Sequence, residues 1–91
     1  MKKALRLHLT GNMQSLFYKQ FIKDAATSLN VKGFLRVLHD ARVEIFLEGD
    51  AGNVDTVADI CKKGPKYASV RSFEQREEKL QDFKEFKIIN F

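Results

Sequence analysis

The first part of the chain alternates strictly between apolar and polar side chains. In the segment LRLHLT at positions 5–10, leucine occupies every second position and the residues between are charged or polar. This period of two is typical of a strand with one buried and one exposed face. Gly11 and Asn12 favour turns, so we expect them to end the strand.

The spacing then changes to that of helices. Over 17–29 the apolar residues recur at intervals of three and four, with Lys19, Gln20, Lys23 and Asp24 on the other side, which predicts a helix whose buried stripe includes Phe21 and Ile22. A second helix is predicted from Val54, Val57, Ala58 and Cys61. We expect Asn53 to cap its start and Gly64 with Pro65 to end it.

The remaining segments predict strands. The stretch FLRVLHDARVEIFLEG at 34–49 is predicted to form two strands joined by a hairpin at 39–41, and 68–77 and 86–91 supply a further strand and a short last one. The order is β-α-β-β-α-β with an extra short C-terminal strand. A hairpin excludes a parallel crossover, so we expect an antiparallel sheet with both helices on one face, an α+β ferredoxin-like two-layer sandwich.

Composition narrows the class of protein. The 91 residues, 44% of them hydrophobic and eight of them Phe, suit one domain over 1–91 with its own core. A formal net charge of +4 favours anionic partners only mildly. The single cysteine, Cys61, lies on the apolar face of the second helix, so we expect a buried thiol, no disulfide and a cytoplasmic protein. Arg6 and His8 interrupt the apolar start, so no signal peptide or membrane span is predicted. We also expect a monomer.

The turn after the first strand resembles a known motif. Gly11, Asn12, Met13, Gln14, Ser15, Leu16, Phe17, Tyr18 and Lys19 occupy the places of Gly-x-Val-Gln-Gly-Val-x-Phe-Arg, the signature of the acylphosphatase family. Gly11 and Gln14 match, whereas Ser15 replaces the second glycine and Lys19 replaces the arginine. The family's second motif, Gly-Trp-Val-Arg-Asn followed by Asp-Gly-x-Val-Glu, is similar to GFLRVLHDARVE at 33–44. Here Val37 stands in place of the asparagine and Ala41 in place of the hairpin glycine.

This resemblance spans nearly the whole chain and implies hydrolysis of acyl phosphates, which are carboxyl-phosphate anhydrides, with no metal and no organic cofactor. It implies that backbone N–H groups around a strand-to-helix turn bind the phosphate of a small anionic ligand. The implied anion-binding loop consists of Gln14, Ser15, Leu16, Phe17, Tyr18 and Lys19.

Two substitutions bear on catalysis. The family arginine meets phosphate with a rigid bidentate fork, whereas Lys19 offers a mobile point charge. The family asparagine orients the attacking water, and the side chain of Val37 has no hydrogen-bonding atom. We therefore expect weak or absent hydrolysis, with Lys19 in the catalytic arginine's place and the role of the asparagine lost at Val37. Ser15 can serve simply as a helix cap, and Val37 as a core residue.

Two alternatives follow from the same residues. The chain can be a pseudoenzyme, a non-catalytic module that binds anions or another protein on this scaffold. An RNA-binding module is less favoured: VKGFLRV at 31–37 resembles part of an RNA-recognition string, but it lies on the second predicted strand instead of the third. Nucleic acid is therefore not the expected partner. We interpret His8 and His39 as surface residues, since neither has a ligand partner nearby in the sequence.

Overall fold

The structure is a computed structural model that describes residues 1–12, 16–64 and 69–89. Its elements follow the predicted order. They are β1 (Lys2–Asn12), α1 (Leu16–Ser28), β2 (Lys32–Val37), β3 (Val43–Asp50), α2 (Ala51–Lys63), β4 (Ser69–Glu78) and β5 (Phe86–Ile89).

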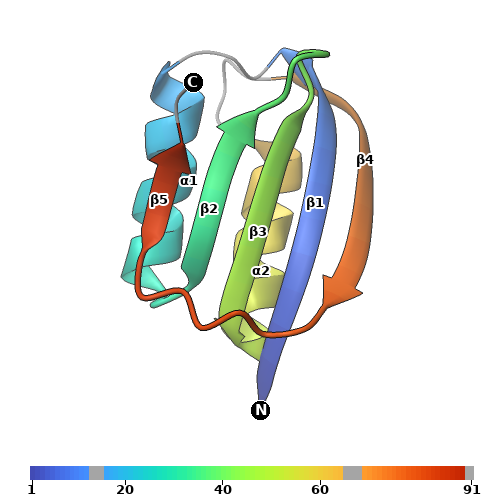
Figure 1. Cartoon of the computed structure of the whole chain (residues 1–91). Helices are drawn as coiled ribbons and strands as arrows, with labels where there is room; N and C mark the ends of the chain where they lie inside the picture. The colour runs from blue at the N-terminus through green and yellow to red at the C-terminus, as the bar shows by residue number, and fades with distance from the viewer. Residues whose placement is uncertain (13–15, 65–68, 90–91) are drawn as a thin grey trace.

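The strands form one sheet in the order β4-β1-β3-β2-β5 (Figure 1). The long β1 pairs antiparallel with both β3 and β4, and β2 pairs antiparallel with β3. In contrast, β5 pairs parallel with β2. The prediction of a purely antiparallel sheet was therefore wrong, and the sheet is mixed. The cause is the β4–β5 connection, which crosses from one edge of the sheet to the other before β5 begins, so that β5 runs in the direction of β2.

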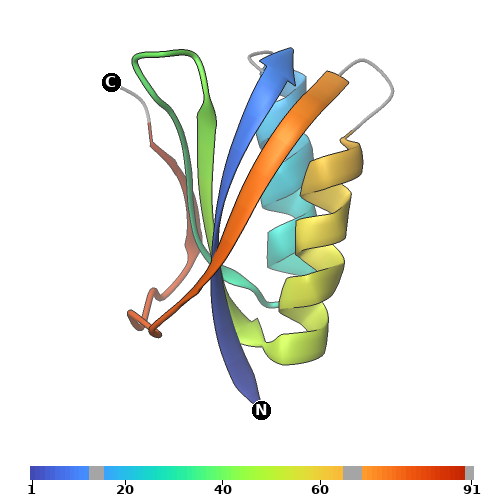
Figure 2. The same ribbon diagram turned by 90° about the vertical axis from the view of Figure 1, so that its right-hand side faces the viewer.

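Both helices cover the same face of the sheet, as predicted, and among the described residues the segment that lies across the other face is the β4–β5 connection (Figure 2). The leucines of β1 explain this arrangement, because Leu5, Leu7 and Leu9 are buried in the core between sheet and helices. Ile22 of α1 and Val57 of α2 are also fully buried in it. The thiol of Cys61 lies there too, and burial raises its pKa to about 12. The βαββαβ order, the helices on one face and the extra strand confirm the ferredoxin-like sandwich.

Two local predictions were wrong. The cap of α2 is Asp50, whose side chain accepts hydrogen bonds from the backbone N–H groups of Gly52 and Asn53, while Asn53 lies inside the helix and donates to the Leu29 carbonyl oxygen. The second error concerns Phe21, which is 40% exposed. The core-facing stripe of α1 lies further around the helix, so Ile22 is buried and Phe21 lies on its flank.

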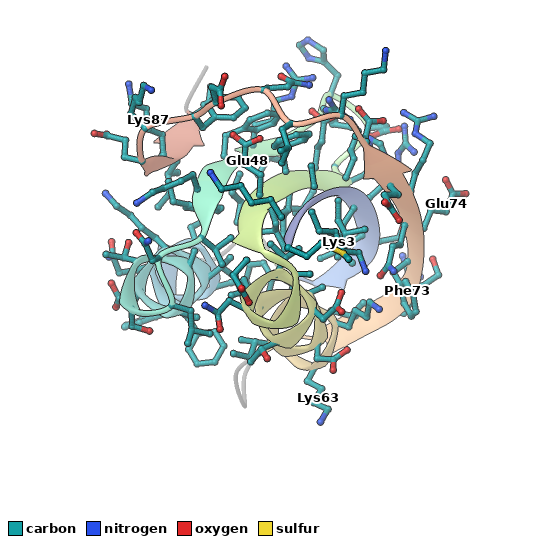
Figure 3. All side chains as sticks on the ribbon, turned by 90° about the horizontal axis from the view of Figure 1, so that it is seen from below. Lys3, Glu48, Lys63, Phe73, Glu74 and Lys87 are labelled. Atoms are coloured by element: carbon teal, nitrogen blue, oxygen red, sulfur yellow. The ribbon has the colours of Figure 1, made fainter. Side chains whose placement is uncertain are left out.

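The connection between β4 and β5 is attached to the sheet by a buried carboxylate. Glu48 of β3 is 4% exposed, and its two oxygens accept hydrogen bonds from the backbone N–H groups of Gln81 and Phe83 at 2.7 and 2.6 Å. Figure 3 shows Glu48 beneath this connection. The ring of Phe83 packs against Phe34 and Phe46, so polar and apolar contacts together hold the connection across the open face.

Candidate active site

β1 passes through a glycine near its end and extends over both predicted stop residues, because Gly11 and Asn12 still pair with Val70 and Ser69 of β4. Gly11 has φ +152°, a region that side chains rarely adopt, and the pairing of β1 with β4 shifts register between Thr10 and Gly11. This irregularity in the pairing lies at the place where the family motif begins. Of the predicted loop residues, Gln14 and Ser15 lie outside the described part of the chain, and α1 begins at Leu16.

The first turn of α1 is anchored by Tyr18. Its side chain is fully buried, and its hydroxyl donates to the backbone carbonyl oxygen of Cys61 at 2.9 Å. Burial raises the pKa of Tyr18 above its ordinary value. Because Cys61 belongs to the last turn of α2, this bond fixes the start of one helix against the end of the other, and with it the position of Lys19.

The start of α1 is electropositive. Its first turn contains no acidic residue, so the partial positive charge of the helix terminus is not offset there. Lys19 follows Tyr18 and is half-buried, and its side chain forms no hydrogen bond or ion pair with the residues that the structure describes. A lysine close to the positive end of a helix is locally unfavourable, and an anion bound there would relieve that repulsion.

The other predicted catalytic position is at the end of β2. Val37 is paired with Val43 of β3, which is in turn paired with Leu9 near the end of β1. Its partly buried side chain packs against the core, as its interpretation as a core residue requires. Figure 1 shows that the end of β2 and the start of α1 lie at the same end of the molecule. The fold therefore brings together the two elements that carry Val37 and Lys19.

The open face of the sheet carries a charged cluster that the sequence patterns did not reveal. Glu44 of β3 is 5% exposed and accepts hydrogen bonds from Arg6 of β1, from Arg36 of β2 and, at 3.2 Å, from the Nε2 atom of His8. Burial alone would raise the pKa of Glu44, but the bonds from Arg36 and Arg6 outweigh it and hold that pKa below its ordinary value. The interpretation of His8 as a simple surface residue was therefore wrong, because cross-strand pairing places Glu44 beside it. His39 is exposed, as expected.

The aromatic residues of the open face pack on one another. Phe46 is fully buried, and Phe34 stacks on it at a centroid distance of 5.9 Å. Phe83 contacts both rings, and the Arg6 guanidinium lies 5.2 Å from the Phe46 centroid. RNA-recognition sheets instead leave such rings available for stacking on bases. The arrangement gives no support to the RNA-binding alternative.

Comparison with known proteins identifies the family. The family model described as Acylphosphatase matches residues 5–88. The chain belongs to the acylphosphatase family. An acylphosphatase of Rubrobacter xylanophilus is 38% identical over 76 residues, which cover 84% of this chain and 69% of the relative. One of Caldanaerobacter subterraneus is 34% identical over 90 residues, covering 97% of this chain and 99% of the relative.

The fold agrees with solved acylphosphatases. The crystal structure of the Bacillus subtilis acylphosphatase superposes with a TM-score of 0.90 at 23% identity, covering 99% of this chain and all of the other. Membership of the acylphosphatase family supports hydrolysis of acyl phosphates, small phosphorylated substrates, as the general activity. Over the residues that the structure describes, no helix has the length and apolar character needed to cross a bilayer, and no three metal-binding side chains cluster.

Proposed function

We propose that this protein binds acyl phosphates at the start of α1 and hydrolyses them far more slowly than acylphosphatases that have the family's arginine and asparagine. The observation that carries the proposal is the pair of substitutions, Lys19 and Val37, on two elements that the fold brings to the same end of the sheet. The family model matches the chain over residues 5–88, so the scaffold is that of the family. The defect is therefore expected in chemistry and not in folding.

Binding is expected to survive these substitutions. Backbone N–H groups at the turn and the first turn of α1, from Ser15 to Lys19, are independent of side-chain identity and would hold the phosphate. Lys19 keeps the positive charge of the family arginine, and the absence of acidic residues in the first turn of α1 leaves that charge available. The lysine lacks the planar fork that aligns two phosphate oxygens at once. Affinity is retained while orientation of the phosphate suffers.

We expect catalysis to fail because the attacking water molecule is not oriented. The family asparagine orients the attacking water molecule, and the isopropyl group of Val37 can neither donate nor accept a hydrogen bond. That side chain packs partly into the core instead. A water that is displaced by about 1 Å from its reactive position can cost on the order of 100-fold in rate. We propose that the reaction takes place in the cytoplasm and needs no cofactor.

The test is hydrolysis of a small aromatic acyl phosphate by the purified protein. A relative that has the family's arginine and asparagine is assayed beside it, and a buffer blank measures spontaneous breakdown. The expected result is a rate well below that of the relative, together with amide chemical-shift changes at Phe17 to Lys19 when phosphate is added. A rate equal to that of the relative would contradict the proposal. Shift changes without any hydrolysis would favour the alternative of a non-catalytic anion-binding module.

A further inference from the structure

The open face of the sheet contains a hollow that is separate from the start of α1. It lies beside β1 and β4 near the β2–β3 hairpin and has a volume of about 420 Å³. Its lining consists of Arg6, His8, Arg42, Glu74, Gln75 and Arg76. Three arginines from three different segments thus meet around one hollow.

Two of these arginines have unused donors. Arg42 bonds Asp40 through its Nε atom at 2.7 Å, and Arg76 bonds Glu78 through its Nε atom at 2.8 Å. The η nitrogens of these two side chains donate no hydrogen bond to any residue that the structure describes. The side chain of Arg76 is 71% exposed and that of Asp40 is 56% exposed, and such exposed pairs are weak. Both guanidinium groups can therefore donate to a ligand while they keep their present bonds.

The third arginine has a structural role. Arg6 donates through Nη1 to Glu44 at 2.9 Å and through Nη2 to Glu78 at 3.3 Å. Through these bonds Arg6 already pairs with Glu44 and Glu78, the two carboxylates next to it. Glu74 lies on the rim, directly across from His8 in the pairing of β1 with β4, and its side chain forms no hydrogen bond or ion pair with the residues that the structure describes. Its charge opposes an anion, so it limits the affinity of the hollow without removing the arginine donors.

We propose that this hollow is a second anion site, which binds the phosphate group of a phosphomonoester through the η nitrogens of Arg42 and Arg76. Guanidinium groups match phosphate oxygens two at a time, which a lysine pair cannot do. Three arginines lie here beside four carboxylates, those of Asp40, Glu44, Glu74 and Glu78, so the hollow has no net positive charge and binding depends on the geometry of the guanidinium groups. The site does not involve Lys19 and is independent of the reaction proposed above.

The experiment is a titration of the whole protein with inorganic phosphate, at constant ionic strength maintained with chloride, followed by amide chemical shifts. The expected result is a saturable shift at His8, Gln75 and Arg76. Replacing both arginines (Arg42→Ala with Arg76→Ala) should weaken this binding by roughly 10-fold or more, the loss of charge-assisted hydrogen bonds. Shifts at Phe17 to Lys19 should keep the affinity of the unmodified protein.

Two further variants make the test specific. Arg71→Ala removes the same charge from the same strand, but Arg71 is the extra residue at the register shift of β4 and does not line the hollow. It lies beyond Phe73, whose ring contacts Lys62 of α2. Figure 3 shows Phe73 and Glu74 pointing to different sides of β4. Arg71→Ala should change the affinity less than 2-fold, by the small effect of a distant exposed charge. Glu74→Gln should increase affinity by roughly 2- to 5-fold, a gain that misfolding cannot imitate.

The outcomes are separable. A loss in the double variant together with a gain in Glu74→Gln would support the site. Equal losses in the double variant and in Arg71→Ala would overturn it, because general electrostatic attraction would then explain the binding. Shifts confined to the start of α1 would also overturn it, while leaving the proposed acyl phosphate site intact.

Discussion

The hydroxyl of Tyr18 donates to the backbone carbonyl oxygen of Cys61 at 2.9 Å and thereby joins the first turn of α1 to the last turn of α2. Carbonyl groups in the last turn of a helix lack partners within the helix, and this one is buried. One hydrogen bond therefore satisfies a helix end and positions the turn that carries Lys19.

Removing this hydroxyl should destabilise the protein. Tyr18→Phe keeps the ring but leaves the Cys61 carbonyl unpaired, so we expect a loss of about 1 to 3 kcal/mol in the free energy of unfolding. Denaturant melts measure the change. Ser28→Ala is the control, because its hydroxyl also donates to a backbone carbonyl oxygen, that of Ala25, but at an exposed position. The control should stay within about 0.5 kcal/mol, and an equal effect of both substitutions would contradict the anchoring role.

The phase of α1 can be tested with two neighbouring residues. Ile22 is fully buried, so Ile22→Ala should cost roughly 2 to 5 kcal/mol because it leaves a cavity in the core. Phe21 is 40% exposed, and Phe21→Ala should cost distinctly less in the same urea titration. Similar losses for the two variants would show that the helix is rotated from the orientation described.

A close contact between strands requires glycine at position 33. Gly33 has φ +141°, and a Cβ atom added there would lie 1.8 Å from the backbone oxygen of Phe46. Gly33→Ala should therefore lower the free energy of unfolding by more than about 3 kcal/mol or prevent folding. Gly52→Ala is the control, since a Cβ atom there would meet only the Asp50 side chain at 3.4 Å. Expression yield and thermal melts of the two variants should differ clearly.

Glu44 should make the free energy of unfolding depend on pH in the acid range. Its pKa is lowered in the folded state by Arg36 and Arg6, so its contribution is fully present above the unfolded value of about 4.3 and is lost as pH falls from there through the lower pKa of the folded state. Glu44→Gln should cost about 1 to 3 kcal/mol at neutral pH and reduce the fall in stability between neutral and acid pH. Exposed Glu85→Gln serves as the control. A pH profile unchanged by Glu44→Gln would exclude Glu44 as the cause.

Hydrolysis should be recoverable by restoring both family residues. Lys19→Arg supplies the phosphate fork and Val37→Asn supplies a partner for the water, and each alone leaves the other defect in place. Because the two groups act on one transition state, the double variant should exceed the product of the single effects in a mutant cycle on kcat/KM. Ser15→Gly in the same background tests whether serine strains the loop. An unmodified protein as fast as the double variant would show that another group orients the water.

Local patterns in the sequence were sufficient for the elements and for the family. The period-two leucines of β1 and the helical spacing around Ile22 and Val57 show which side chains are buried on folding. This pattern of burial repeats every few residues, so it can be read from short segments of the sequence. The order of elements and the hairpin then allowed few topologies. The motif at 11–19 identified the family because it is contiguous in the chain.

Only the tertiary structure decided the contacts between distant segments. The parallel pairing of β5 with β2 follows a connection that is bound by Glu48, a residue of β3 that lies 33 positions before Gln81. His8 and Glu44 meet because two strands pair in one register, and Phe21 is exposed because the position of α2 and the sheet sets which side of α1 is covered. Such contacts join residues far apart in the chain, so no local period records them, and they appear only when the whole sheet is assembled.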